Sequence, residues 1–192
     1  LFDRLDVSPV RLAIHLTMAF VILALALWTA LGAFAWPSRE SRFGAPRWCL
    51  FALMSLVLVQ VVFGALLAGS DGGAAYADWP RIGGDWIPSS AFLLEPVWRN
   101  FTEDHATQHL VHRTTGYVVA LIALTLAIVG MIAGKGAGRG VAFVLALVVA
   151  GQVALGIATV VSASPIGLSL THQAGAVALW VTILASARTA WR

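Results

Sequence analysis

Five long apolar stretches dominate this sequence, and each is long enough to cross a lipid bilayer as a helix. They occupy residues 9–33, 48–69, 105–133, 140–162 and 168–190. A bilayer core of about 30 Å requires about 20 apolar residues in helical form. With 59% hydrophobic and 11% charged residues, the chain is also too apolar for an ordinary soluble domain. We therefore expect an all-α membrane protein with five transmembrane helices.

Basic residues in the connections predict the orientation of these helices, because cytoplasmic loops of membrane proteins carry an excess of Lys and Arg. The long connection at 70–104 contains more acidic than basic residues, and we expect it outside together with the N-terminus. The connections after the first and third stretches, and the C-terminus, are expected in the cytoplasm. Their basic residues are Arg39, Arg42, Arg47, Lys135, Arg139, Arg188 and Arg192.

Three histidines, His15, His112 and His172, each lie near the outer start of a predicted membrane helix. A rise of 1.5 Å per residue places them at similar depths. An ionisable side chain inside a membrane helix is costly and is by default a functional candidate. Neutral imidazoles on facing helices of a bundle are suitable axial ligands for haem iron. The pattern predicts that His112 and His172 bind a haem.

The residues leave alternatives open. His109 lies three residues before His112 and shares its helix face, so it is a weak rival as a ligand. His105 is expected in the wet interface and not as a ligand. Zinc is less favoured than haem, because the chain has one cysteine and no His-Glu-x-x-His pair. A transporter or assembly factor with structural histidines is a further alternative, but mid-helix Asp, Glu and Lys are missing from the predicted spans, which argues against ion coupling.

The first and last stretches share a histidine near the outer start, at His15 and His172. Same-direction repeats of this kind occur in membrane architectures. We therefore interpret residues 1–36 as the last helix of a preceding bundle and residues 37–192 as a complete four-helix bundle. On this interpretation, His15 requires a partner outside the chain. Because the sequence begins at Leu1 without Met, we also expect a fragment of a longer protein.

Four segments resemble the haem A synthase family, membrane enzymes that convert haem O to haem A for terminal oxidases. The most specific is a glycine-rich exit from the second stretch followed by an aromatic and proline-rich loop. The segments are Arg11-Leu-Ala-Ile-His15, residues 68–80 with Asp85-Trp86-Ile-Pro88, His112-Arg113, and His172-Gln173 with Gly175. The similarity covers nearly the whole chain but only the later part of the family pattern, and three preceding helices are absent.

The resemblance implies a reaction and site residues. In the family, the second bundle binds haem b through two histidines that match His112 and His172. The first bundle is thought to bind the substrate haem O through a pair of which His15 matches the later member. The implied reaction oxidises a ring methyl group of haem O to a formyl group by successive hydroxylations. The acidic residue associated with this chemistry falls in the missing part, so no catalytic residue is assigned and the fragment alone is expected to be inactive.

Further residues have expected supporting roles. Arg113 is placed to pair with a haem propionate or to extend to the interface, and Arg11 is placed similarly for the substrate haem. The glycines Gly116, Gly151, Gly156 and Gly175 suggest close approach of helices or of a flat ring. The aromatic residues of the loop at 70–104, which are Tyr76, Trp79 and Trp86, are expected to form an ordered lid or an aromatic belt.

The implied cofactor is haem b, with haem O as substrate. The implied partners are membrane lipid, the enzyme that supplies haem O and an electron donor that the sequence does not identify. A homo-oligomer stays open, and no nucleic-acid partner is expected. The expected location is the inner (plasma) membrane of a bacterium. The alternative function is a b-type cytochrome that carries electrons without a substrate porphyrin, and the loop motif at 68–88 is what favours the synthase.

Overall fold

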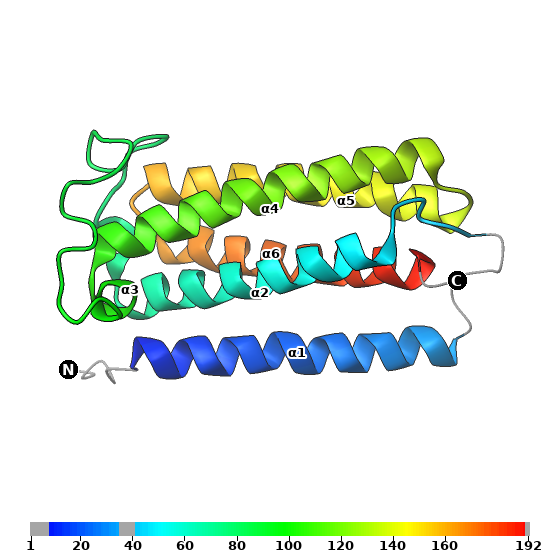
Figure 1. Cartoon of the computed structure of the whole chain (residues 1–192), viewed down its shortest axis with the longest axis horizontal. Coiled ribbons are helices and arrows are strands. Elements are labelled where there is room, and N and C mark those ends of the chain that lie inside the picture. Colours follow the sequence, from blue (N-terminus) through cyan, green and yellow to red (C-terminus); the bar gives the residue numbers. More distant parts are fainter. Residues whose placement is uncertain (1–7, 35–40, 191–192) are drawn as a thin grey trace.

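The computed structural model describes residues 8–34 and 41–190, and the long elements of this part are all α-helices (Figure 1). Five of them are long and apolar enough to cross a membrane. Their bounds agree with the predicted stretches to within three residues at each end. The helices are α1 (Pro9–Ala33), α2 (Arg47–Gly69), α4 (His105–Ala133), α5 (Ala137–Val161) and α6 (Ile166–Ala190).

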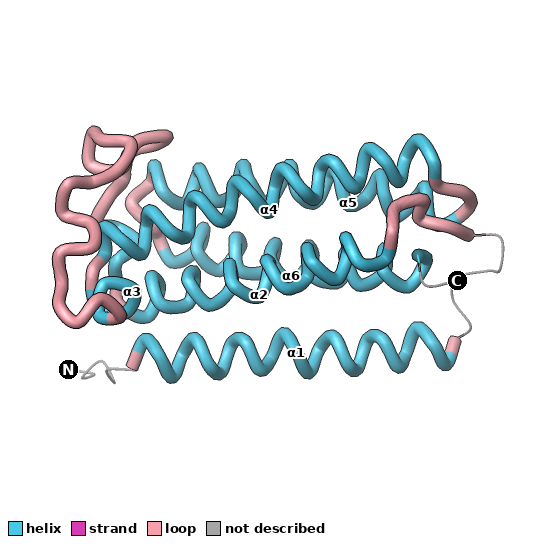
Figure 2. Tube along the Cα trace, in the orientation of Figure 1, coloured by secondary structure: helices cyan, strands magenta, loops and turns pink. Residues whose placement is uncertain are grey.

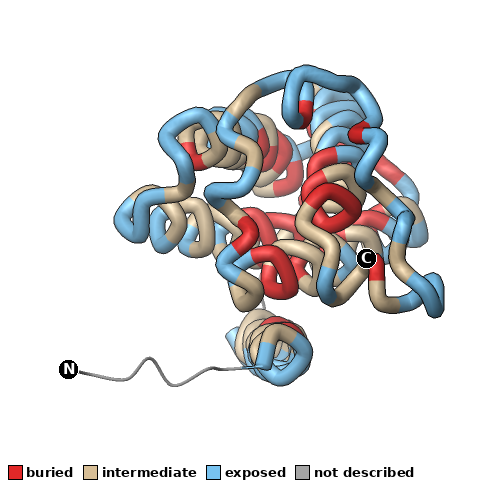
Figure 3. Tube along the Cα trace, turned by 90° about the vertical axis from the view of Figure 1, so that its left-hand side faces the viewer, coloured by how far each residue is buried: buried red, intermediate tan, exposed pale blue. Residues whose placement is uncertain are grey.

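Four of these helices form a closed bundle. Helix α2 packs against α4, α4 against α5, α5 against α6, and α6 against α2, so that α4 and α6 lie diagonally across the bundle. Helix α1 runs along its outside, against α2 and α6 (Figures 1 and 3). The indole of Trp180 on α6 is buried and donates a hydrogen bond to the carbonyl of Phe20 on α1 at 2.9 Å.

The apolar residues explain why the helices assemble in this way. The inner faces contribute fully buried side chains such as Leu50, Leu53, Leu145 and Ile183, which pack into one continuous core. The outer faces are apolar as well, and Leu121 and Ile132 are 69% and 75% exposed. A helix that is apolar all round is typical of a membrane span, where lipid covers the outer face.

The two ends of the bundle differ. At one end the backbone of Arg42 pairs with that of Lys135, and Arg47, Arg139 and Arg188 lie in the terminal turns of their helices. At the other end lies the connection at 70–104, which is ordered and contains η1 (Gly72–Ala74) and α3 (Arg99–Glu103) (Figure 2). The predicted basic residues Arg39 and Arg192, and the predicted domain boundary at residues 36 and 37, lie outside the described residues.

Candidate functional site

The two predicted ligands, His112 and His172, lie on diagonally opposite helices near the same end of the bundle. His112 is on α4 and His172 on α6, and both helices begin beside the connection at 70–104. Cofactor sites in four-helix bundles are built from side chains on separate helices, and the placement of His112 and His172 allows such a site.

His112 is packed against a glycine on the neighbouring helix α2. A Cβ at Gly64 would lie 2.9 Å from Cε1 and 3.4 Å from Nδ1 of this imidazole. The carboxamide nitrogen of Gln60, one turn earlier on α2, lies 3.4 Å from Nε2 of His112. The oxygen of the same carboxamide accepts a hydrogen bond from the hydroxyl of Thr115. Nδ1 of His112 is buried and has no hydrogen-bond partner among the described residues.

His172 is packed in the same way against α5. A Cβ at Gly156 would lie 3.0 Å from Cε1 and 3.6 Å from Nδ1 of this imidazole. Gln152, one turn earlier on α5, donates a hydrogen bond from Nε2 to the backbone carbonyl of His172 at 3.1 Å. Nδ1 of His172 is likewise buried, and nothing in the described part of the chain bonds to it.

These features fit a haem between the two imidazoles. A buried polar atom without a partner is costly, which makes the two Nδ1 atoms conspicuous in an otherwise apolar bundle. Each imidazole also packs with one edge against a glycine of the neighbouring helix, and any larger residue at that glycine would occupy the space of the ring. Within residues 8–34 and 41–190, no group of three or more His, Cys, Asp or Glu side chains could hold a metal ion. Two imidazoles on separate helices of one bundle are a ligand set suited to haem iron.

The structure does not bring His15 to the pair. His15 and Arg11 are one turn apart on α1, and both are exposed. Helix α1 faces the bundle through other residues, including the buried Ala13 and Phe20. His15 therefore lies near the same end of the molecule as His112 and His172 but is exposed on the outside of their bundle, and its partner stays a prediction.

His109 and His105 contact the loop that follows α2. His109 is 1% exposed, and its Nε2 donates to the carbonyl of Gly72 at 2.9 Å. Its Nδ1 accepts a hydrogen bond from Arg113 at 3.1 Å, so both ring nitrogens have protein partners. His105 donates from Nε2 to the carbonyl of Ser70 at 3.2 Å. These histidines hold the exit of α2, which the sequence did not reveal.

Arg113 makes more hydrogen bonds than either of its predicted roles requires, whether it pairs with a haem propionate or extends to the membrane interface. Its guanidinium donates to the carbonyls of Tyr76, Asp78 and Arg81, each at 2.8 Å, as well as to His109. Only its Nε, which is buried, lacks a hydrogen-bond partner in the described part of the chain. Arg113 therefore binds the loop, and one of its donors stays available for an acidic group.

The loop that Arg113 binds is ordered by hydrogen bonds of its own. The carboxylate of Asp78 accepts from the backbone N–H groups of Gly84 and Gly83, at 2.8 and 2.9 Å, and these bonds lower the pKa of Asp78 below its usual value. Both glycines have positive φ, which few other residues adopt at low cost. These bonds fix the turn at residues 78–84, and its role as a lid stays a prediction.

The aromatic residues of the loop differ in their positions. The ring of Tyr76 meets that of His109 edge to face at 5.3 Å. The indole of Trp79 donates to the hydroxyl of Tyr117 on α4 at 3.0 Å. Trp86 is 66% exposed, with the guanidinium of Arg81 over its ring. Tyr76 and Trp79 thus cover the end of the bundle, whereas Trp86 has the exposure of an interfacial residue.

Four glycines are expected to allow close approach of helices. Three of them lie in close contact with a side chain of a neighbouring helix. Gly116 lies against Gln60, Gly156 against His172, and Gly175 against Gln152. The prediction for Gly151 is wrong, because a Cβ there would meet nothing within 4 Å. Sequence reasoning missed Gln60 and Gln152, although each is an amide inside a predicted membrane span and precedes a glycine by four residues.

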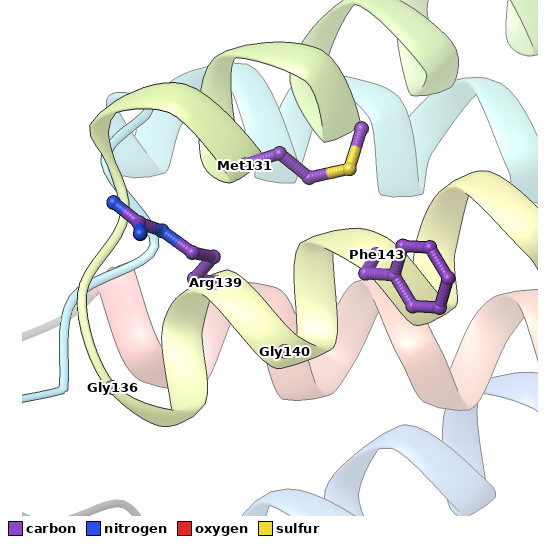
Figure 4. A pocket seen from close by; sticks show the side chains of 5 residues that line it. All are labelled: Met131, Gly136, Arg139, Gly140 and Phe143. Atoms are coloured by element: carbon purple, nitrogen blue, oxygen red, sulfur yellow. The ribbon is translucent and has the colours of Figure 1, made fainter.

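Two cavities of the structure lie away from the two histidines and the two glutamines. One, of about 480 Å³, is lined by Met131, Gly136, Arg139, Gly140 and Phe143 at the opposite end of α4 and α5 (Figure 4). Another, of about 260 Å³, lies between α1, α2 and α6 and includes Val21, Phe51 and Trp180 in its lining. Both have mainly apolar linings, and neither brings together groups that could transfer a proton or bind a metal.

Comparison with known proteins identifies the family of this chain. A family model described as COX15-CtaA, cytochrome oxidase assembly protein, matches residues 1–184. Similar proteins are the haem A synthases of Maricaulis maris (41% identity over all of this chain and 56% of that protein) and Paracoccus denitrificans (40% over 95% and 49%). The haem A synthase of Roseobacter denitrificans is 38% identical over 93% of this chain and 48% of its own length.

The chain thus spans about half the length of the relatives it matches. No solved structure matches it significantly. The family model covers nearly all of the sequence, including the histidines, the loop at 70–104 and the long helices up to residue 184 of α6. By this match, the chain belongs to the COX15-CtaA family of cytochrome oxidase assembly proteins.

Proposed function

We propose that this chain contains the haem b-binding bundle of a haem A synthase, with His112 and His172 as the axial ligands. One observation carries the proposal: the two imidazoles lie on diagonal helices near the same end of the bundle, and each has a buried Nδ1 with no partner among the described residues. Two axial imidazoles leave no open position on iron, so the bound haem would transfer electrons. Haem A synthases with about 40% identity support the assignment.

The residues around this site have proposed roles of their own. The Nε–H of Arg113, buried and unpartnered within the described residues, is the donor we assign to a haem propionate. Its other donors hold residues 76–81 over the end of the bundle. This loop would keep water from the site, and exclusion of water is one means by which a protein sets a redox potential.

The substrate site would lie beyond the outer face of α1. We propose that residues 1–36 belong to a preceding bundle, in which His15 ligates the iron of haem O and Arg11 pairs with its propionates. The exposure of both residues on one face of α1 supports this division. Because the chain spans about half of its relatives, oxidation of the haem O methyl group is proposed for the whole protein and not for the chain by itself.

The proposed orientation places the N-terminus and residues 70–104 outside a bacterial inner membrane and the C-terminus in the cytoplasm. The clustering of Arg42, Arg47, Lys135 and Arg139 at one end of the bundle supports this orientation. Membrane lipid, the enzyme that supplies haem O and an electron donor are the proposed partners. A homo-oligomer stays a matter for measurement.

The experiment is expression of the chain in a bacterium that makes haem O but no haem A, followed by purification and chromatography of the extracted haem. We expect about one haem b for each chain and no haem A. Joining the chain to the preceding helices of the Maricaulis maris relative should restore formation of haem A. A purified, helical chain that retains no haem b would contradict the proposal.

A further inference from the structure

The haem site is surrounded by two copies of one arrangement of side chains. On α2, Gln60 precedes Gly64 by four residues, and on α5, Gln152 precedes Gly156 by four. In both cases the glycine lies under the edge of a histidine on the next helix. A Cβ added at Gly64 would lie 2.9, 3.4 and 3.7 Å from Cε1, Nδ1 and Nε2 of His112. A Cβ added at Gly156 would lie 3.0, 3.6 and 3.7 Å from the same three atoms of His172.

The packing is reciprocal, because each glutamine lies against a glycine on the histidine's own helix. A Cβ at Gly116, four residues after His112, would lie 3.1 Å from Nε2 of Gln60. A Cβ at Gly175, three residues after His172, would collide with the carboxamide oxygen of Gln152. The pair formed by α2 and α4 thus repeats in the pair formed by α5 and α6, although the two are separate in sequence.

Helix contact alone does not explain this repeat. Small residues let membrane helices approach, but they do not require an amide beside them. Each of these amides has a direct contact with a histidine, at Nε2 of His112 and at the backbone carbonyl of His172. The carboxamide oxygen of Gln152 is also buried and lacks a partner in the described part of the chain, which is unfavourable for a polar atom in a helix contact.

We propose that Gln60 with Gly64, and Gln152 with Gly156, position His112 and His172 for binding to haem iron, the first through a ring nitrogen and the second through the backbone carbonyl. The inference rests on the proposed function of this bundle. In each case the glycine sets the position of the ring edge. The amide of Gln60 then fixes the ring of His112 at Nε2, and the amide of Gln152 fixes the backbone of His172 at its carbonyl. Neighbours of this kind orient the ligands of metal sites, and their loss typically costs about 10- to 100-fold in affinity.

The test uses the whole chain, purified in detergent, and measures haem content, the rate of haem loss to an excess of apomyoglobin, and the electron paramagnetic resonance spectrum of the oxidised protein. This spectrum depends on the rotation of the axial imidazoles and does not require enzyme activity. The variants are Gln60→Leu, Gln152→Leu, Gly64→Ala and Gly156→Ala. The matched control is Gly151→Ala on α5, where an added methyl group meets nothing within 4 Å.

We expect both glutamine variants to lose haem about 10-fold faster, with shifted low-spin signals. Each glycine variant should lose most of its haem, while Gly151→Ala matches the unchanged chain. Circular dichroism identifies a variant that is unfolded, and the glutamine variants then decide, because they leave Gly64 and Gly156 unchanged. Unchanged haem loss and unchanged spectra in both folded glutamine variants would overturn this inference alone. An unchanged chain without haem would overturn the proposed function as well.

Discussion

Arg113 donates a hydrogen bond from Nη2 to Nδ1 of His109, one turn earlier on α4, at 3.1 Å. The other ring nitrogen of His109 donates to the carbonyl of Gly72. The pair therefore joins the start of α4 to the loop that follows α2. Since both nitrogens of His109 have protein partners, the nearest rival of His112 as a ligand has a structural role.

We expect His109→Ala to retain haem b at about one haem for each chain, because the substitution removes a loop contact and no ligand. The measurement is the reduced optical spectrum of the purified variant, together with its haem content. Loss of the low-spin spectrum from a folded His109→Ala chain would instead identify His109 as a ligand.

The loop at 72–86 should become mobile in Arg113→Leu. The substitution removes three charged hydrogen bonds to backbone carbonyls, and hydrogen bonds of this kind contribute about 1.5 to 3 kcal/mol each. If local stability falls by one such contribution, the backbone amides of this loop should exchange about 10- to 150-fold faster. Hydrogen–deuterium exchange of residues 72–86 measures this change.

Arg99→Leu is the matched control for that experiment. Arg99 is an arginine of the same connection, but it pairs with Glu103 at the surface, at 2.7 Å. An exposed ion pair contributes little to stability, and the hydrogen bonds of Arg99 are to Glu95 and Glu103, so exchange at 72–86 should stay unchanged. Equal exchange in Arg113→Leu and the unchanged chain would contradict the role of Arg113 as a loop anchor.

Asp78 should titrate below the usual aspartate pKa of 3.8, because the backbone N–H groups of Gly84 and Gly83 bond to its charged form. A folded-state pKa below the unfolded value stabilises the loop at pH values above the unfolded pKa. This stabilisation is lost as the pH falls through the folded pKa. The carboxyl ¹³C shift of Asp78, assigned with Asp78→Asn, measures the midpoint, and a midpoint at or above 3.8 would contradict the assignment.

The sequence predicts the helices well because their signal is long and local. About 20 consecutive apolar residues are visible without tertiary information, and the glycines and prolines between them mark the breaks. The bounds of α1 and α4 were therefore correct, and α5 was only displaced by three residues at its start. The common depth of His15, His112 and His172 follows from the same regularity.

The surroundings of the site were harder to predict, because they depend on which helices are neighbours. The bonds of Arg113 to residues 76–81 join segments more than 30 residues apart, and no local pattern indicates them. The contact of Gln60 with His112 likewise requires the pairing of α2 with α4. A polar residue inside an apolar span was the available signal, and Gln60 and Gln152 both satisfy it.

The measurement that tests the account most directly is the reduced-minus-oxidised optical spectrum of the purified chain, beside those of His112→Ala, His172→Ala and His15→Ala. We predict a low-spin b-type spectrum that is lost in the first two variants and retained in the third, because His15 is exposed on α1 and faces away from the bundle. A chain without haem, or a spectrum unchanged in His112→Ala and His172→Ala, would contradict it.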